Sequence, residues 1–168
     1  MIEENLSQPW LVAVMLIVFG LVLLVADRAP AKKQEEQFRL RESGLMGLGQ
    51  AVALQPGVSR SGATMTVGRF LGFDRNAAAR ISFLMSLPVT AGALAYKGAQ
   101  LVGDGGLPPG TAPAFFWGVV TSGVTGLAAI HYLLKLLRTT SFTPFVVYRV
   151  IAGAVVLLLI VTGVRPAT

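Results

Sequence analysis

The chain of 168 residues contains no cysteine, so it can form neither a disulfide nor a thiolate metal site, and it has no cysteine nucleophile. Charge is also scarce: Asp, Glu, Lys and Arg make up 13% of the residues, whereas soluble domains carry roughly 25%. Hydrophobic residues make up 54% of the chain. We therefore expect an integral protein of a lipid bilayer. The net charge of +6 comes from basic residues scattered over loops and segment ends, a pattern that argues against a nucleic-acid partner.

Four apolar segments are long enough to cross a bilayer as helices, for which about 17–25 residues are needed. The expected spans are residues 10–26, 75–96, 114–137 and 144–162. A charged connector, residues 27–43, follows the first span and is expected to be an exposed helix or loop. Asp74 is expected to cap the second span, because an aspartate oxygen accepts hydrogen bonds from the free N–H groups of a helix start.

Residues 45–73 contain two apolar stretches, each about half as long as a span requires, with a Pro-Gly turn between them. We expect them to form a re-entrant hairpin whose tip reaches the middle of the membrane. Irregular backbone is tolerated at that depth only where protein or a water-filled cavity surrounds it, so the turn should line a site. The expected fold is thus an all-α polytopic membrane protein with about four transmembrane helices and one re-entrant helix-loop-helix hairpin.

Basic residues indicate the orientation of these segments. The connector contains five Lys or Arg residues, and more follow between the hairpin and the second span, whereas Lys97 and Arg165 fall on the other side. By the positive-inside rule, the hairpin enters from the cytoplasm and returns to it, and both termini lie outside.

The turn of the hairpin, residues 55–64, has the sequence QPGVSRSGAT. An arginine at the centre of a membrane costs about 2.5–3.5 kcal/mol even on insertion scales, so Arg60 is expected to have a function. Backbone N–H groups exposed by Gly57 and Gly62 can join the Arg60 guanidinium in a cradle for a phosphate or diphosphate.

The chain offers no evident carboxylate to balance Arg60, or Arg149 in the last span. All acids are expected in termini, connectors or helix starts: Glu3, Glu4, Asp27, Glu35, Glu36, Glu42, Asp74 and Asp104. Either an anionic ligand or another polypeptide segment must supply the counter-charge.

Other short motifs accompany the turn motif in this chain. They are GQA at residues 49–51, SFL at residues 82–84, Pro88, and Tyr148-Arg149 followed by Gly153. Together these residues resemble the bacitracin-resistance family of undecaprenyl-diphosphate phosphatases. The resemblance implies hydrolysis of undecaprenyl diphosphate to undecaprenyl phosphate and phosphate, which recycles the lipid carrier of cell-wall synthesis and confers bacitracin resistance. It further implies a multi-pass protein of the bacterial inner (plasma) membrane, a polyprenyl diphosphate lipid as substrate, and a divalent cation, Mg²⁺ or Ca²⁺.

By this resemblance, Ser59, Arg60 and Thr64 belong to the catalytic site. Arg60 is expected to bind phosphoryl oxygens bidentately and to stabilise charge that develops during phosphoryl transfer. Ser59 is a nucleophile, a phosphate ligand or only an N-cap, and a nucleophilic serine would need an adjacent base. Thr64 either donates a hydrogen bond to phosphate or caps the second half-helix.

Five further residues are expected to bind the diphosphate or shape its site: Gly57, Ser61, Gly62, Gln50 and Arg149. The two glycines permit the turn and a close approach of the backbone. For Ser61 the alternative is capping, and for Gln50 it is an interhelical hydrogen bond. Arg149 binds the second phosphate, pairs with a glutamate outside this chain, or extends its head group to the nearby membrane surface.

The resemblance covers only the C-terminal part of the family pattern. Family members carry an earlier inverted repeat with a glutamate-rich motif and a Ser-Ser-x-Gly-His string, neither of which occurs here; the single histidine, His131, lies in a different context. Sites of inverted-repeat proteins lie where the two repeats meet. We therefore expect that Met1 is an internal or misassigned start, that the metal ligands lie outside this chain, and that an N-terminal half or a second copy completes the site. Three interpretations remain open: a phosphatase completed in this way, a non-catalytic remnant, or a transporter or flippase of phospho-lipids.

Overall fold

The computed structural model describes residues 8–163, and every regular element within them is a helix. The elements are α2 (Pro9–Arg28), a 3-10 helix (Glu35–Gln37), α3 (Leu40–Val52), α4 (Arg60–Phe70), α5 (Arg75–Gly103), α6 (Ala112–Leu137) and α7 (Thr143–Val161). The all-α prediction is confirmed. Met1, Glu3, Glu4 and Arg165, which entered the expectations on chain start, charge and orientation, lie outside the described residues.

Four of these helices, α2, α5, α6 and α7, are long and apolar enough to cross a membrane. Their bounds match the expected spans except that α2 continues through Asp27 to Arg28 and α5 continues past Lys97 to Gly103. The glycine at residue 98 does not end α5, because one glycine costs a helix only about 1 kcal/mol. The helix ends at Gly103, and the chain cannot continue as a helix because Gly105 and Gly106 just beyond it have φ angles of +92° and +86°.

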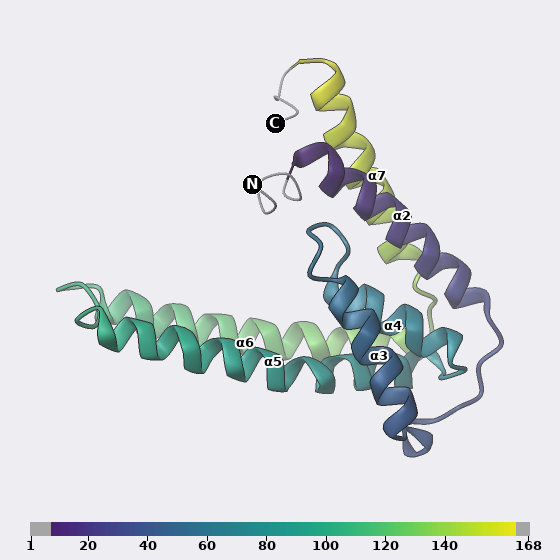
Figure 1. The fold of residues 1–168 in the computed structure, drawn as a ribbon, viewed down its shortest axis with the longest axis horizontal. Helices are drawn as coiled ribbons and strands as arrows, with labels where there is room; N and C mark the ends of the chain where they lie inside the picture. Colours follow the sequence, from purple (N-terminus) through teal and green to yellow (C-terminus); the bar gives the residue numbers. More distant parts are fainter. Residues whose placement is uncertain (1–7, 164–168) are drawn as a thin grey trace.

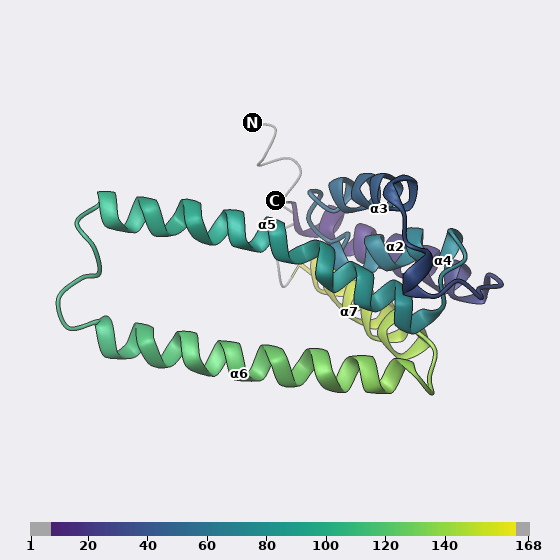
Figure 2. The same ribbon diagram turned by 90° about the horizontal axis from the view of Figure 1, so that it is seen from below.

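The spanning helices form two pairs that meet at one end and diverge from it (Figure 1). In one pair, α2 lies along α7. A β-carbon on Gly153 of α7 would lie 2.8 Å from the Ala13 carbonyl oxygen and 2.7 Å from Ile17 Cγ1, so only glycine permits this approach. The other pair, α5 and α6, forms a long hairpin that extends away from the rest of the molecule (Figure 2).

Helices α3 and α4 lie where two half-length helices were predicted within residues 45–73, but α3 begins at Leu40, inside the stretch assigned to the connector. They have 13 and 11 residues, too few to span a bilayer. A β-carbon on Gly49 of α3 would lie 2.6 Å from Val67 Cγ2 of α4, which shows how closely the two pack. The insertion of this hairpin into a membrane stays a prediction.

The connector between α2 and α3 is attached to the turn between α4 and α5. The Lys33 N–H donates to the Gly72 carbonyl oxygen at 2.8 Å, and the Asp74 N–H donates to the Lys33 carbonyl oxygen at 2.9 Å. Glu35 forms an ion pair with Arg80 of α5 at 2.7 Å. The connector is therefore bound to the hairpin base over part of its length rather than free in solvent.

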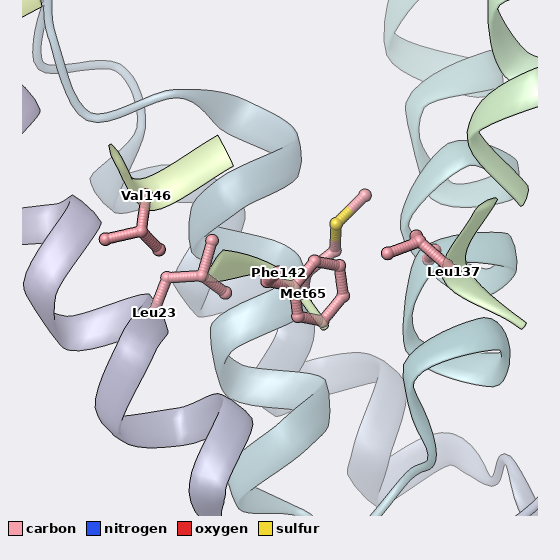
Figure 3. Packing of buried hydrophobic residues seen from close by; sticks show 6 residues of the cluster. Leu23, Met65, Leu137, Phe142 and Val146 are labelled. Carbon is pink, nitrogen blue, oxygen red and sulfur yellow. The ribbon is translucent and has the colours of Figure 1, made fainter. Parts of the chain in front are cut away.

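The main apolar core lies where the two helix pairs meet. Its buried side chains come from α2, α4, α5, α6 and the start of α7: Leu23, Met65, Ala79, Leu137, Phe142 and Val146. Figure 3 shows Leu23 beside Val146, with Met65 and Phe142 between them and Leu137. Because α4 contributes to this core, the site at its first residue is fixed relative to both pairs.

Asp27, in the last turn of α2, is the polar centre of this junction. Its side chain is 4% exposed and accepts hydrogen bonds from Arg75 Nε at 2.6 Å and from the Phe142 N–H at 3.1 Å. The buried Arg69 guanidinium donates to the Asp27 carbonyl oxygen at 2.7 Å. The expectation that every acid lies in a terminus, connector or helix start is wrong for Asp27, because its partners are distant in sequence and no local pattern indicates them.

Replacing Asp27 with asparagine should lower the thermal stability of the protein strongly. The change removes the negative charge that balances Arg75 and Arg69, and loss of one partner of a buried ion pair costs about 3 kcal/mol or more. Thermal unfolding in detergent measures the effect, with the exposed Glu36→Gln as control. Equal midpoints for the two variants would contradict the role given to Asp27.

Candidate functional site

The turn between α3 and α4 has a backbone conformation that few residues adopt. Gly57 has φ +92° and Ser59 has φ +66°, and Ser59 is the one non-glycine residue with positive φ in the described part of the chain. Ser59 caps α4, since its Oγ accepts a hydrogen bond from the Gly62 N–H at 3.3 Å. Such backbone strain costs about 1–3 kcal/mol and is concentrated at functional sites.

Gly57 lets this turn pack directly against α2. A β-carbon at this position would lie 2.4 Å from the Val12 carbonyl oxygen, so even alanine would force the turn away from the helix. The positive φ independently disfavours any other residue. The predicted structural role of Gly57 therefore has two separate physical reasons.

Arg149 of α7 binds the same turn from the other side. Its side chain is buried, and its Nη2 donates to the carbonyl oxygens of Gly57 and Val58, each at 3.0 Å. Its Nε donates to the Leu16 carbonyl oxygen of α2 at 3.3 Å. The guanidinium thus joins α2, α7 and the turn. It does not extend to the nearby membrane surface, which was one of the three alternatives for Arg149.

The remaining nitrogen of this guanidinium, Nη1, has no acceptor among residues 8–163. A β-carbon on Gly62 would lie 2.9 Å from Nη1 and 3.2 Å from Ser59 Oγ, so all three groups border one small space. The space is a cavity of about 130 Å³ lined by Ser59, Ser61, Gly62 and Arg149. Apolar side chains from α2, α4, α6 and α7 form its other walls: Leu23, Met65, Leu133, Phe142 and Phe145.

Arg60 points to a different cavity. Its guanidinium makes no hydrogen bond or ion pair with the described residues, and with Gln50 it lines a cavity of about 370 Å³ between the hairpin and α5. Met85 and Val89 of α5 form part of the opposite wall. The structure therefore brings Ser59, Ser61, Gly62 and Arg149 together on one side of the α4 start, and Arg60 and Gln50 on another.

Thr64 lines neither cavity. Its side chain is 1% exposed, and its Oγ1 donates to the Arg60 carbonyl oxygen at 2.8 Å within α4. Ser82 of α5 donates to the Ser61 carbonyl oxygen at 3.4 Å and so connects the first turn of α4 to α5. Both hydroxyls support the backbone of the turn in this structure.

No metal site is formed by the residues that the structure describes. No group of three or more His, Asp or Glu side chains lies together among them. No carboxylate lines the cavity of Ser59 or that of Arg60. His131 lies near the end of α6 and lines a separate cavity. The groups present there do not fit a divalent cation.

The groups around the start of α4 have the properties of an anion site. Two guanidinium groups, two serine hydroxyls and a helix N-terminus are all donors, and oxyanions bind to such groups. Ser59 was predicted from its residue type and motif, but its strained backbone and the separate positions of the two arginines depend on three-dimensional packing. Fold and site together define a helical membrane protein with a turn rich in hydrogen-bond donors.

Comparison with known proteins names the family. The chain matches the family described as Bacitracin resistance protein BacA over residues 1–155, and it belongs to that family. It is 45% identical over 172 residues to an undecaprenyl-diphosphatase of Nocardioides sp., an alignment that covers 99% of this chain and 60% of the relative. An undecaprenyl-diphosphatase of Geobacter metallireducens is 47% identical over 155 residues, which cover 92% of this chain and 57% of the relative. The chain thus spans about 60% of the length of such relatives.

Replacing Gly62 with alanine should weaken anion binding without destabilising the helix. The new methyl group would occupy the space beside Arg149 Nη1 and Ser59 Oγ, whereas alanine favours α-helix over glycine by up to about 1 kcal/mol. Titration with pyrophosphate in detergent measures the loss. Gly44→Ala is the matched control, because a β-carbon there has no atom within 4 Å; equal affinity in both variants would contradict the placement of the site.

Replacing Arg149 with lysine should lower stability although the charge is kept. One ammonium group cannot reproduce the fork that donates to Leu16, Gly57 and Val58. We expect a loss of about 2 kcal/mol or more from carbonyl oxygens left without donors. Thermal unfolding midpoints in detergent test this, and a midpoint equal to the wild type would refute the structural part of the Arg149 role.

Proposed function

We propose that this protein acts in the hydrolysis of undecaprenyl diphosphate to undecaprenyl phosphate and inorganic phosphate, and so contributes to bacitracin resistance. The observation that carries the proposal is the strained turn at the start of α4, where Ser59 shares one cavity with Arg149 and the next residue, Arg60, lines another. Curated relatives at about 45% identity bear the name undecaprenyl-diphosphatase, which agrees with such a site.

The donors of the turn suit the two ends of a diphosphate. In the proposed reaction, the bond between the bridging oxygen and the terminal phosphorus breaks, and a water oxygen ends on the released phosphate. Arg149 Nη1 and the α4 N-terminus, which border the same cavity as Ser59 Oγ, would bind the terminal phosphoryl oxygens. Arg60, whose planar fork can donate two hydrogen bonds, would bind the phosphate that stays on the lipid and the charge that develops on the bridging oxygen. Positive charge placed in advance around these oxygens lowers the barrier of phosphoryl transfer.

Ser59 has two possible roles in this reaction. Its Oγ either attacks the terminal phosphorus, giving a phosphoserine that water then hydrolyses, or binds a phosphoryl oxygen while water attacks directly. Attack by Ser59 requires a base that accepts its proton, and no imidazole or carboxylate lines its cavity among the described residues. The base is therefore assigned to a part of the site outside the described residues.

A complete site requires partners. We propose that an N-terminal segment corresponding to the remaining length of the relatives, or a second copy of the chain, contributes the base and the ligands of a divalent cation, Mg²⁺ or Ca²⁺. The lipid tail would lie among the apolar helices. The protein would reside in the bacterial inner membrane and cross it four times, with the hairpin entering from the cytoplasm and both termini outside; basic residues at the ends of the spans support this orientation.

Phosphate release from undecaprenyl diphosphate tests the proposal. We would measure it in detergent with Mg²⁺ or Ca²⁺, for the chain alone and for the chain co-expressed with the N-terminal segment of the Nocardioides relative. We expect activity in the co-expressed pair and a loss of at least about a hundredfold on Arg60→Ala, since removal of one charge-stabilising donor costs this much in comparable sites.

Arg41→Ala is the matched control, because Arg41 is an exposed arginine near the start of α3 and lines neither cavity of the turn. Activity that survives Arg60→Ala as well as Arg41→Ala would sink the assignment of Arg60. Transport of the lipid without phosphate release, by a pair shown to assemble, would favour a transporter over a phosphatase.

A further inference from the structure

A second group of basic side chains lies away from the turn, where α5 begins and α6 ends. These side chains line a cavity of about 510 Å³ between the two helices, called here the basic groove. Its residues are Asn76 and Arg80 from α5, and His131, Leu134, Lys135 and Arg138 at the end of α6. The groove shares no residue with either cavity of the candidate site.

The spacing of the groove residues explains why they converge. Asn76 and Arg80 are four residues apart on α5, and His131 and Lys135 are four apart on α6, so each pair projects from one face of its helix. Asn76 Nδ2 donates to the Leu134 carbonyl oxygen at 3.1 Å and fixes the two helices to each other at this point. The groove therefore results from the packing of the two helices at this end of the α5–α6 hairpin; Figure 2 shows the course of the two helices.

Positive charge in the groove is only partly balanced. Glu35 pairs with Arg80 at 2.7 Å. Lys135 and Arg138 are exposed and form no ion pair within the described range. Asp27 and Asp74 line a neighbouring cavity with Arg138 but form no ion pair with it. Asp27 pairs with Arg75, and Asp74 caps α5 by accepting the Ala77 N–H. Two unpaired cations in one concave site favour an anionic ligand.

The surroundings of the groove select the kind of anion. It lies at the ends of two helices long and apolar enough to span a membrane, which is the depth of lipid head groups. Beyond it, exposed apolar side chains follow both helices: Leu84 and Leu87 on α5 are 59% and 61% exposed, and Leu127 on α6 is 73% exposed. A ligand that fits both parts has a phosphate head and a hydrocarbon tail.

We infer that the basic groove binds the phosphate of an anionic phospholipid, with an acyl chain along the exposed apolar faces of α5 and α6. Basic pockets between transmembrane helices at the cytoplasmic side bind such head groups. Arg138 also lines a neighbouring cavity of about 720 Å³, whose other charged residues are Arg28, Arg69 and Arg75 together with Asp27 and Asp74. This lipid site is independent of the proposed function, and its test requires no phosphatase activity.

Thermal unfolding of the chain in a neutral detergent, with phosphatidylglycerol or phosphatidylcholine added, tests the inference. The variant carries Lys135→Gln and Arg138→Gln together, both at exposed positions where folding should be unaffected. The matched control is Lys97→Gln, an exposed lysine towards the other end of α5. Inorganic phosphate and glycerol 3-phosphate serve as soluble probes of the same chemistry.

Phosphatidylglycerol should raise the unfolding midpoint of the wild type and of Lys97→Gln, and the double variant should need about tenfold more of it for the same rise. Phosphatidylcholine should give no such difference. An equal response of both variants to phosphatidylglycerol overturns the site. If inorganic phosphate raises the wild-type midpoint as much as phosphatidylglycerol does, the assignment to a lipid is overturned.

Lys135 and Arg138 could also stabilise the protein only by balancing the negative end of the α6 dipole. That role would lower the midpoint of the double variant by the same amount in both lipids and leave its response to phosphatidylglycerol unchanged. Such a result overturns the inference as well. Native mass spectrometry of retained lipids gives an independent count, with less phosphatidylglycerol expected on the double variant than on Lys97→Gln.

Discussion

The site depends on the burial of one guanidinium. A buried arginine is tolerated only when its donors have acceptors, and Arg149 finds them in the carbonyl oxygens of Leu16, Gly57 and Val58. The turn also needs a donor at this position, because the carbonyl groups of Gly57 and Val58 both face Arg149 Nη2 and accept no hydrogen bond within a helix. The guanidinium and the carbonyl groups thus provide each other's hydrogen-bond partners, and these bonds hold the strained backbone next to Ser59 in place. The phosphate-binding chemistry proposed for the turn thus depends on a residue ninety positions away in the sequence.

Much of the fold follows from local patterns. Apolar length predicted the four long helices, and the short apolar stretches on either side of a Pro-Gly turn predicted α3 and α4. Asp74 was expected to cap α5, and it does so by accepting the Ala77 N–H at 2.7 Å. These features depend on neighbours within a few residues, which a single sequence displays directly.

The arrangement of the site could not be predicted in the same way. The motif placed Ser59 and Arg60 next to each other, yet their side chains border different cavities, because Ser59 is a non-helical N-cap with φ +66° and Arg60 is the first residue of the helix. Asp27 followed an apolar run and suggested a connector, but its partners Arg75 and Phe142 are 48 and 115 residues away. Contacts between residues so far apart cannot be read from residue spacing or composition. A charged residue at the end of a predicted segment can therefore be buried or exposed, and the sequence does not show which.

The hydrogen bond from the Phe142 N–H to Asp27 also constrains how the protein is made. It closes a segment of 115 residues, so the junction of the two helix pairs cannot be completed before the last helix has been synthesised. Until then, α2 lacks its neighbour α7, and the Arg149 donors that support the turn are absent. The hairpin must therefore wait in an unfinished conformation until α7 has been made, so the site forms well after its own residues in the turn have been synthesised.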